Sequence, residues 1–316
     1  MELIRKKGGN SVRVNRYAGE AFGKSYEVVY LTFPILEETG VVRHLFSTRV
    51  GGVSKGDCES MNLSYARGDE KAAVDENFRR IAEIFGAGPE RIVCSKQTHT
   101  TNVRLATEAD CGKGVVYPLD YDDVDGLITN VPGVLLCTSY ADCVPLYFVD
   151  TENKAIGLSH SGWRGTVNKM GKRTLQAMRE AFGTRPEKVT AAIGPSICRD
   201  CYEVDEEVAE QFRKAFPGEW EYLLYEGKKS GKYQLDLWEA NKRVLLREGV
   251  LPENLAVTDV CTCCNSKYLF SHRASCGKRG NLAAVMELCA RIEDDDKVEE
   301  VAAIRGELIQ EGKIRG

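Results

Sequence analysis

Residues 155–165 read Ala-Ile-Gly-Leu-Ser-His-Ser-Gly-Trp-Arg-Gly, and this stretch indicates the fold class. Its first five residues form an apolar run of strand composition, which leads into His160 and a glycine-rich turn. The following segment, 166–182, has the pattern of a helix that ends at Gly183. A strand that passes directly into a helix predicts a mixed α/β chain. His160 is a potential metal ligand at the junction of the two elements.

Strands and helices alternate in both directions from this stretch. Strand composition occurs at residues 26–33, 41–49, 133–137, 144–149, 189–193, 255–260 and 282–288, and helical periodicity at 71–85, 205–216 and 236–248. No Pro/Ser-rich or highly charged tract divides the chain. We therefore expect residues 1–40 to form strands that pack on the main domain, and residues 41–316 to form a single domain.

The composition is that of an ordinary globular protein. Of the 316 residues, 43% are apolar and 28% are charged, and the net charge is -4. No basic stripe favours nucleic acid as a partner, and no apolar run approaches the roughly 18 residues of a membrane-spanning helix. We therefore expect no membrane segment. Twelve irregularly spaced cysteines suit reduced thiols or metal ligands, so we expect a reducing, cytoplasmic location.

Histidine is scarce, which limits where a metal site can form. The chain has four histidines, namely His44, His99, His160 and His272. His99, Cys143 and His160 each lie beside an apolar run and next to glycine or polar residues. Two imidazoles and one thiolate suit catalytic zinc, which uses three protein ligands and leaves one position open. Their spacings of 44 and 17 residues match no local ligand motif.

Each of these residues also has an ordinary interpretation. An isolated histidine is usually hydrogen-bonded at the surface, and a cysteine beside a strand is usually a buried thiol. Cys143 is alternatively a thiolate nucleophile that His160 activates. His44 lies inside a predicted strand and is expected to be structural, and His272 is left out of the metal site.

A series of short motifs follows the chain. They are Phe46-Ser-Thr-Arg-Val-Gly-Gly-Val-Ser54, Met61-Asn-Leu-Ser64, Gln97-Thr-His99, Asp125-Gly126, Ala141-Asp-Cys-Val-Pro145, His160-Ser-Gly-Trp-Arg-Gly165, Ile193-Gly-Pro195, Cys201-Tyr-Glu-Val204 and Phe270-Ser-His-Arg273. This ordered series, within residues 41–288, resembles the bacterial YfiH/YlmD family. That family is also called the laccase-domain or polyphenol-oxidase-like family.

The resemblance implies a single YfiH-type catalytic domain, in which two mixed β-sheets are sandwiched between helices. It also implies a metal bound by His99, Cys143 and His160. The implied substrates are purine nucleosides and phosphate, with phosphorolysis of adenosine, inosine, guanosine and methylthioadenosine, together with deamination of adenosine. Older usage describes the family as copper laccases.

Metal chemistry favours zinc among these possibilities. A multicopper oxidase needs several coppers, each held by imidazoles, and four histidines are too few. A single site of two histidines and one cysteine still binds copper tightly. A copper-dependent phenol oxidase therefore stays an alternative, as does a structural zinc domain that serves protein interactions.

Several further residues are candidates for the reaction or for substrate contacts. Asp142 is a candidate acid for deamination, beside the catalytic Cys143. Arg49 and Arg164 lie in motifs that contain nearby glycines, and both suit phosphate binding. Trp163 either stacks on a purine or packs in the core. Asn62 is assigned to the substrate site with them.

The remaining cysteines leave a question open. Cys198 and Cys201 have C-x-x-C spacing, and further cysteines follow at positions 261, 263, 264 and 276. These residues form a structural zinc site in one interpretation, but the downstream spacing looks irregular. A pair of reduced thiols or an adventitious disulfide is the simpler expectation.

Overall fold

The strands form two large sheets and one small sheet. The structure, a computed structural model, describes residues 1–6, 11–21 and 23–289. The first six-stranded sheet has the order β1 (Arg13–Ala21), β2 (Lys24–Thr32), β3 (Val42–Ser47), β15 (Leu282–Leu288), β7 (Leu135–Tyr140), β4 (Ile92–Cys94). The second has the order β14 (Leu255–Val257), β10 (Val189–Ile193), β8 (Val144–Asp150), β9 (Ala155–Ser161), β6 (Gly126–Thr129), β5 (Val103–Leu105). The small sheet is β11 (Glu203–Asp205), β13 (Lys232–Leu235), β12 (Leu224–Glu226).

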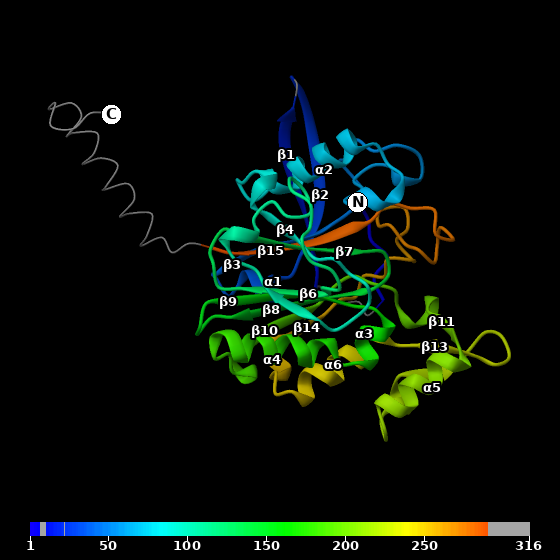
Figure 1. Ribbon diagram of the computed structural model, residues 1–316. Coiled ribbons are helices and arrows are strands. Elements are labelled where there is room, and N and C mark those ends of the chain that lie inside the picture. Colours follow the sequence, from blue (N-terminus) through cyan, green and yellow to red (C-terminus); the bar gives the residue numbers. More distant parts are fainter. Residues whose placement is uncertain (7–10, 22, 290–316) are drawn as a thin grey trace, which may run out of the picture.

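Helices pack against the three sheets. They are α1 (Pro34–Glu37), α2 (Lys71–Glu83), α3 (Trp163–Val167), α4 (Met170–Phe182), α5 (Glu206–Ala215) and α6 (Leu237–Arg247). Figure 1 shows α4 and α6 along the second sheet, with α2 on the opposite side of the molecule beside the first sheet. Among the described residues, no helix combines the length and apolar character needed to cross a membrane.

Strand β8 shows how the sheets come together. All seven of its residues are buried. Because side chains alternate across a strand, Val144, Leu146 and Phe148 pack beneath α4 and α6, whereas Tyr147 and Val149 pack between the two sheets. Burial of both faces explains why residues 144–149 are apolar or aromatic with little alternation. The predicted fold class, two mixed sheets between helices, is confirmed.

Several helices and strands have bounds that differ from the predicted ones. The helix predicted for 166–182 is confirmed over α4, which ends at the predicted Gly183, but its predicted start is wrong. The backbone turns left-handed at Lys169 (φ 62°), so residues 166–167 belong to the separate helix α3. The strand predicted for 133–137 lies at Leu135–Tyr140, and the one predicted for 255–260 ends at Val257. Segment 282–288 forms β15 as predicted.

The N-terminal strands extend the first sheet. Strands β1 and β2 form an antiparallel hairpin, and β2 also pairs with β3. The predicted division into residues 1–40 and 41–316 stays a prediction. The last part of the predicted main domain, residues 290–316, lies outside the described residues.

Candidate functional site

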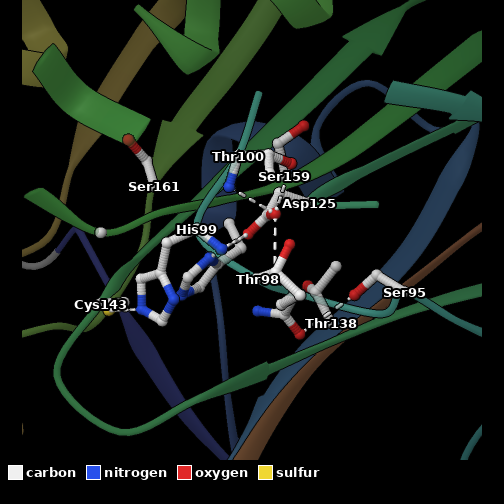
Figure 2. Close-up of polar contacts among 12 residues, drawn as sticks. Ser95, Thr98, His99, Thr100, Asp125, Thr138, Cys143, Ser159 and Ser161 are labelled. Atoms are coloured by element: carbon white, nitrogen blue, oxygen red, sulfur yellow. Dashed lines mark hydrogen bonds and ion pairs between the residues drawn. The ribbon is translucent and has the colours of Figure 1, made fainter. Parts of the chain in front are cut away.

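His99, Cys143 and His160 lie together beside the second sheet. His160 of β9 pairs with Pro145 of β8, so Cys143, directly before β8, lies near the histidine. His99 follows β4 in a turn. One ligand atom from each residue lies within 4.8 Å of the other two, and Cys143 Sγ is 3.9 Å from His99 Nε2. The three sequence-predicted ligands, called the triad below, are therefore brought together, and Figure 2 shows His99 beside Cys143.

Asp125 holds two members of the triad. Its buried carboxylate accepts hydrogen bonds at Oδ1 from His160 Nδ1 (2.8 Å) and from the backbone N–H of His99 (3.1 Å). Oδ2 accepts from the N–H groups of Thr98 (3.2 Å) and Thr100 (2.8 Å) and from the Thr100 hydroxyl (2.9 Å). Figure 2 shows Thr98, His99 and Thr100 around the carboxylate. A hydrogen bond at Nδ1 leaves Nε2 of His160 available to a metal ion.

The turn of residues 98–100 has an uncommon backbone conformation. His99 has a φ of 66°, in the left-handed region that few non-glycine residues occupy. The backbone N–H groups on both sides of it, and its own, all donate to Asp125. These hydrogen bonds compensate the conformational cost and direct an exposed imidazole toward the thiol.

The charges within the triad favour a thiolate. Burial opposes ionisation of Cys143, but the charge of His160 and hydrogen bonds from both histidines lower the pKa of the thiol to about 6. Burial likewise opposes a charge on His160, but Cys143 and Asp125 raise the pKa of its imidazole to about 9. Thiolate is the form in which cysteine binds a metal, and a bound divalent cation takes the place of the imidazole proton.

The space between the ligands also fits a metal ion. A Cβ added to Gly162 would lie 3.0 Å from Cys143 Sγ and 3.0 Å from His99 Cδ2, so the missing side chain keeps this space open. The donor set of two imidazoles and one thiolate suits zinc and leaves a fourth position for water or substrate. Both the geometry and the chemistry of the triad therefore fit one catalytic zinc ion.

We expect Gly162→Ala to weaken zinc binding at the triad by about 10-fold, because the new methyl group displaces its ligands by a few tenths of an ångström. Competition titration with a chromogenic chelator measures this affinity. Gly165→Ala is the matched control, since its added Cβ would meet its nearest neighbour, His160 O, at an ordinary 3.5 Å. Equal affinities of the Gly162→Ala protein and the unmodified protein would contradict this steric interpretation.

Three of the other predicted residues have hydrogen-bond partners within the protein. Both carboxylate oxygens of Asp142 accept hydrogen bonds, from the Thr262 hydroxyl (2.6 Å) and from the N–H of Arg273 (2.7 Å). The Arg49 guanidinium donates to two backbone carbonyls and stacks over the Phe270 ring at 4.7 Å. The buried Asn62 amide donates to Ser64 O and Asp69 Oδ2 and accepts from Asn281 N.

Trp163 and Arg164 have a different environment at the start of α3. The partly buried Trp163 packs against the core cluster beneath α4 and α6. The Arg164 side chain is exposed, and its guanidinium carbon lies 4.2 Å from the Trp163 ring centroid. Because α3 begins directly after Gly162, this pair lies close to the triad along the chain.

Comparison with known proteins assigns the chain to a family. A family model described as multi-copper polyphenol oxidoreductase laccase matches residues 43–289. The chain belongs to this family. It is 37% identical over 239 residues to purine nucleoside phosphorylase YlmD of Geobacillus stearothermophilus, covering 75% of this chain and 87% of that protein. It is 33% identical over 236 residues to adenosine deaminase RL5 of an unknown prokaryotic organism, covering 72% of this chain and 87% of that protein.

A solved structure of the family has the same fold. The chain superimposes on the crystal structure of the hypothetical protein YfiH of Bacillus licheniformis with a TM-score of 0.78 at 29% identity, covering 82% of this chain and 96% of that one. The resemblance to the YfiH/YlmD family that the motifs indicate is therefore confirmed. The curated relatives named above are enzymes, as the sequence predicted for this chain.

Sequence reasoning missed the roles of Asp125 and Gly162. Both residues belong to the motifs that carry the resemblance, but neither motif assigns them a contact with the ligands. The structural role predicted for His44 agrees with its environment. Its Nε2 accepts a hydrogen bond from Phe33 N at 2.8 Å, and burial lowers the pKa of its imidazole to about 3.

Proposed function

We propose that this chain is a zinc-dependent purine nucleoside phosphorylase that also deaminates adenosine. The observation that carries the proposal is the geometry of the triad, with Asp125 behind two of its members. The relatives named as a purine nucleoside phosphorylase and an adenosine deaminase support the choice of substrate class. In this proposal His99, Cys143 and His160 hold the zinc ion, which supplies Lewis acidity and lowers the pKa of water.

The protein's own residues orient the reactants. Phosphorolysis requires inorganic phosphate to attack C1′ of the ribose as the purine leaves. We assign phosphate binding to Arg164, because its guanidinium is exposed beside the triad segment and guanidinium groups match phosphate geometry. Trp163 holds this guanidinium by stacking. Arg49 and Asn62 shape the neighbouring loops, because their polar groups already bind backbone or side-chain partners.

Asp142 has a positioning role in this proposal. Deamination requires water to add at C6 of the purine and ammonia to leave, so a proton must reach the leaving nitrogen. The two oxygens of Asp142 are already engaged by Thr262 and Arg273, and the residue has a left-handed φ of 92° directly before Cys143. Asp142 therefore orients the ligand thiolate, and the acid that serves the leaving ammonia is a group other than this carboxylate.

The donor set argues against multicopper chemistry despite the family's description. Each copper of a multicopper oxidase requires imidazoles, and the chain has four histidines in total. One of these, His44, is buried and accepts a hydrogen bond from Phe33 N. The remaining histidines suffice for one mononuclear site and no multicopper cluster.

Product analysis with and without phosphate tests the proposed function. With phosphate we expect adenosine to give adenine and ribose 1-phosphate as well as inosine and ammonia, and without phosphate only inosine and ammonia. His99→Ala provides the background, because this exposed side chain can be removed with little effect on the core. Absence of all these products above the His99→Ala background, in zinc-loaded protein, would overturn the proposed function.

A further inference from the structure

A second group of ligand-type side chains lies outside the triad. Cys198, Cys201, Cys261 and Cys264, called the cysteine cluster below, have sulfur atoms that all lie within 4.8 Å of one another. Cys201 Sγ and Cys264 Sγ are 3.4 Å apart. Cys263 interrupts the pattern, so the downstream spacing looked irregular, but Cys261 and Cys264 form a second C-x-x-C pair.

The sheet brings the two C-x-x-C pairs together. Strands β10 and β14 are parallel neighbours, and an additional parallel bridge joins Ser196 to Cys261. The loops that leave parallel strands emerge at the same edge of a sheet, so the segments with Cys198 and Cys261 run side by side. The two pairs are far apart in sequence because the small sheet and helices α5 and α6 lie between them.

The backbone beside the cluster supplies hydrogen-bond donors to one of its sulfurs. The backbone N–H groups of Cys198 and Cys264 both donate to Cys261 Sγ, at 3.2 and 3.4 Å. Hydrogen bonds to sulfur stabilise a thiolate. Lys6 supplies a positive charge nearby, since it lines the same cavity as Cys198.

We propose that the cysteine cluster binds a structural zinc ion through its four thiolates. Tetrahedral zinc with bonds of about 2.3 Å places its sulfurs roughly 3.8 Å apart, and the cluster already approaches this spacing. A site of four thiolates has no open coordination position, which is typical of structural zinc. Clusters of several iron atoms need more widely spaced sulfurs than one ion does. A cavity of about 300 Å³, lined by Lys6, Cys198, Arg199 and Asp200 among others, borders the cluster at Cys198.

The proposed ion would stabilise the wall of the active site. Thr262, inside the second C-x-x-C pair, donates its hydroxyl hydrogen to Asp142 Oδ1, and the N–H of Ile197, directly before Cys198, donates to Asp142 O at 3.0 Å. Both loops of the cluster therefore hold the residue that precedes the ligand Cys143. Asn265 joins the same region to the N-terminal segment through two hydrogen bonds with Ile4.

Zinc analysis of the full chain tests this inference independently of nucleoside activity. In the His99→Ala/Cys143→Ala protein, purified with reductant, we expect one tightly bound zinc ion per chain. Replacement of that ion by cobalt should give the intense visible absorption of tetrahedral thiolate coordination. This variant leaves the cluster intact, so its result does not depend on whether cluster variants fold. Absence of tightly bound metal, bound iron instead of zinc, or cluster disulfides found by mass spectrometry would each overturn the proposal.

Cluster variants give a second readout. We expect Cys201→Ser/Cys264→Ser to bind one zinc ion fewer per chain than the unmodified protein, and to unfold at a temperature lower by at least about 5 °C, because structural zinc contributes directly to folding. Cys263→Ser, in the same loop but outside the cluster, should keep its zinc content and unfolding temperature. Unchanged zinc content in the double variant would overturn the proposal.

Discussion

Cys143→Ser is expected to lower the rate of nucleoside phosphorolysis by about 1,000-fold, since the proposed zinc ion would supply several kcal/mol of transition-state stabilisation and each 1.36 kcal/mol is a factor of ten. A serine hydroxyl does not ionise at neutral pH and cannot replace the thiolate as a zinc ligand. The zinc content should therefore fall by one ion per chain together with the activity. Metal analysis and steady-state assays on the same preparation measure both quantities.

The zinc content separates the two roles proposed for this thiol. If Cys143 acts as a nucleophile that His160 activates, the Cys143→Ser protein loses activity but keeps the zinc ion. Cys111→Ser is the matched control, because Cys111 is also partly buried and lies outside both groups of ligands. A Cys143→Ser protein with full zinc content would show that the thiol is not a ligand.

The triad was predictable because each ligand borders an apolar run in a motif of the family. Strands β8 and β9 then bring Cys143 and His160 together through their antiparallel pairing. The position of His99 depends on features that the neighbouring sequence does not indicate. Its left-handed backbone and its orientation both depend on Asp125, which is distant in sequence.

Two other features lay beyond sequence reasoning for physical reasons. The cysteine cluster needs the parallel pairing of β10 with β14, and periodicity does not reveal which strands are neighbours. The break between α3 and α4 depends on one left-handed residue, Lys169, whose side chain packs over the Phe216 ring. Lysine is a good helix former, so its propensity favoured a continuous helix that tertiary packing prevents.

Asp125→Asn is expected to weaken zinc binding at the triad and to lower activity by about 10- to 100-fold each, as loss of a partner that orients metal ligands typically does. The amide keeps the size of the carboxylate but has one accepting oxygen instead of two. The amide nitrogen is a donor, so in either orientation it faces groups that now donate to the carboxylate. In place of Oδ1 it faces the N–H of His99 and Nδ1 of His160. In place of Oδ2 it faces two N–H groups and one hydroxyl of Thr98 and Thr100. Competition titration with a chelator measures the affinity.

The control for this variant is Asp123→Asn. Asp123 is exposed, and its carboxylate accepts a hydrogen bond from the Thr98 hydroxyl at 2.6 Å. It borders the same turn, and its hydrogen bonds are to Thr98, Thr100 and Asn102 instead of the histidines. The zinc affinity of Asp123→Asn should therefore stay within about twofold of that of the unmodified protein, as expected for an exposed substitution. If Asp125→Asn binds zinc as tightly as Asp123→Asn, the turn of residues 98–100 holds His99 without the carboxylate. A selective loss in Asp125→Asn would instead show that one buried charge orients two ligands from separate segments, and thereby couples the β4 turn to strand β9.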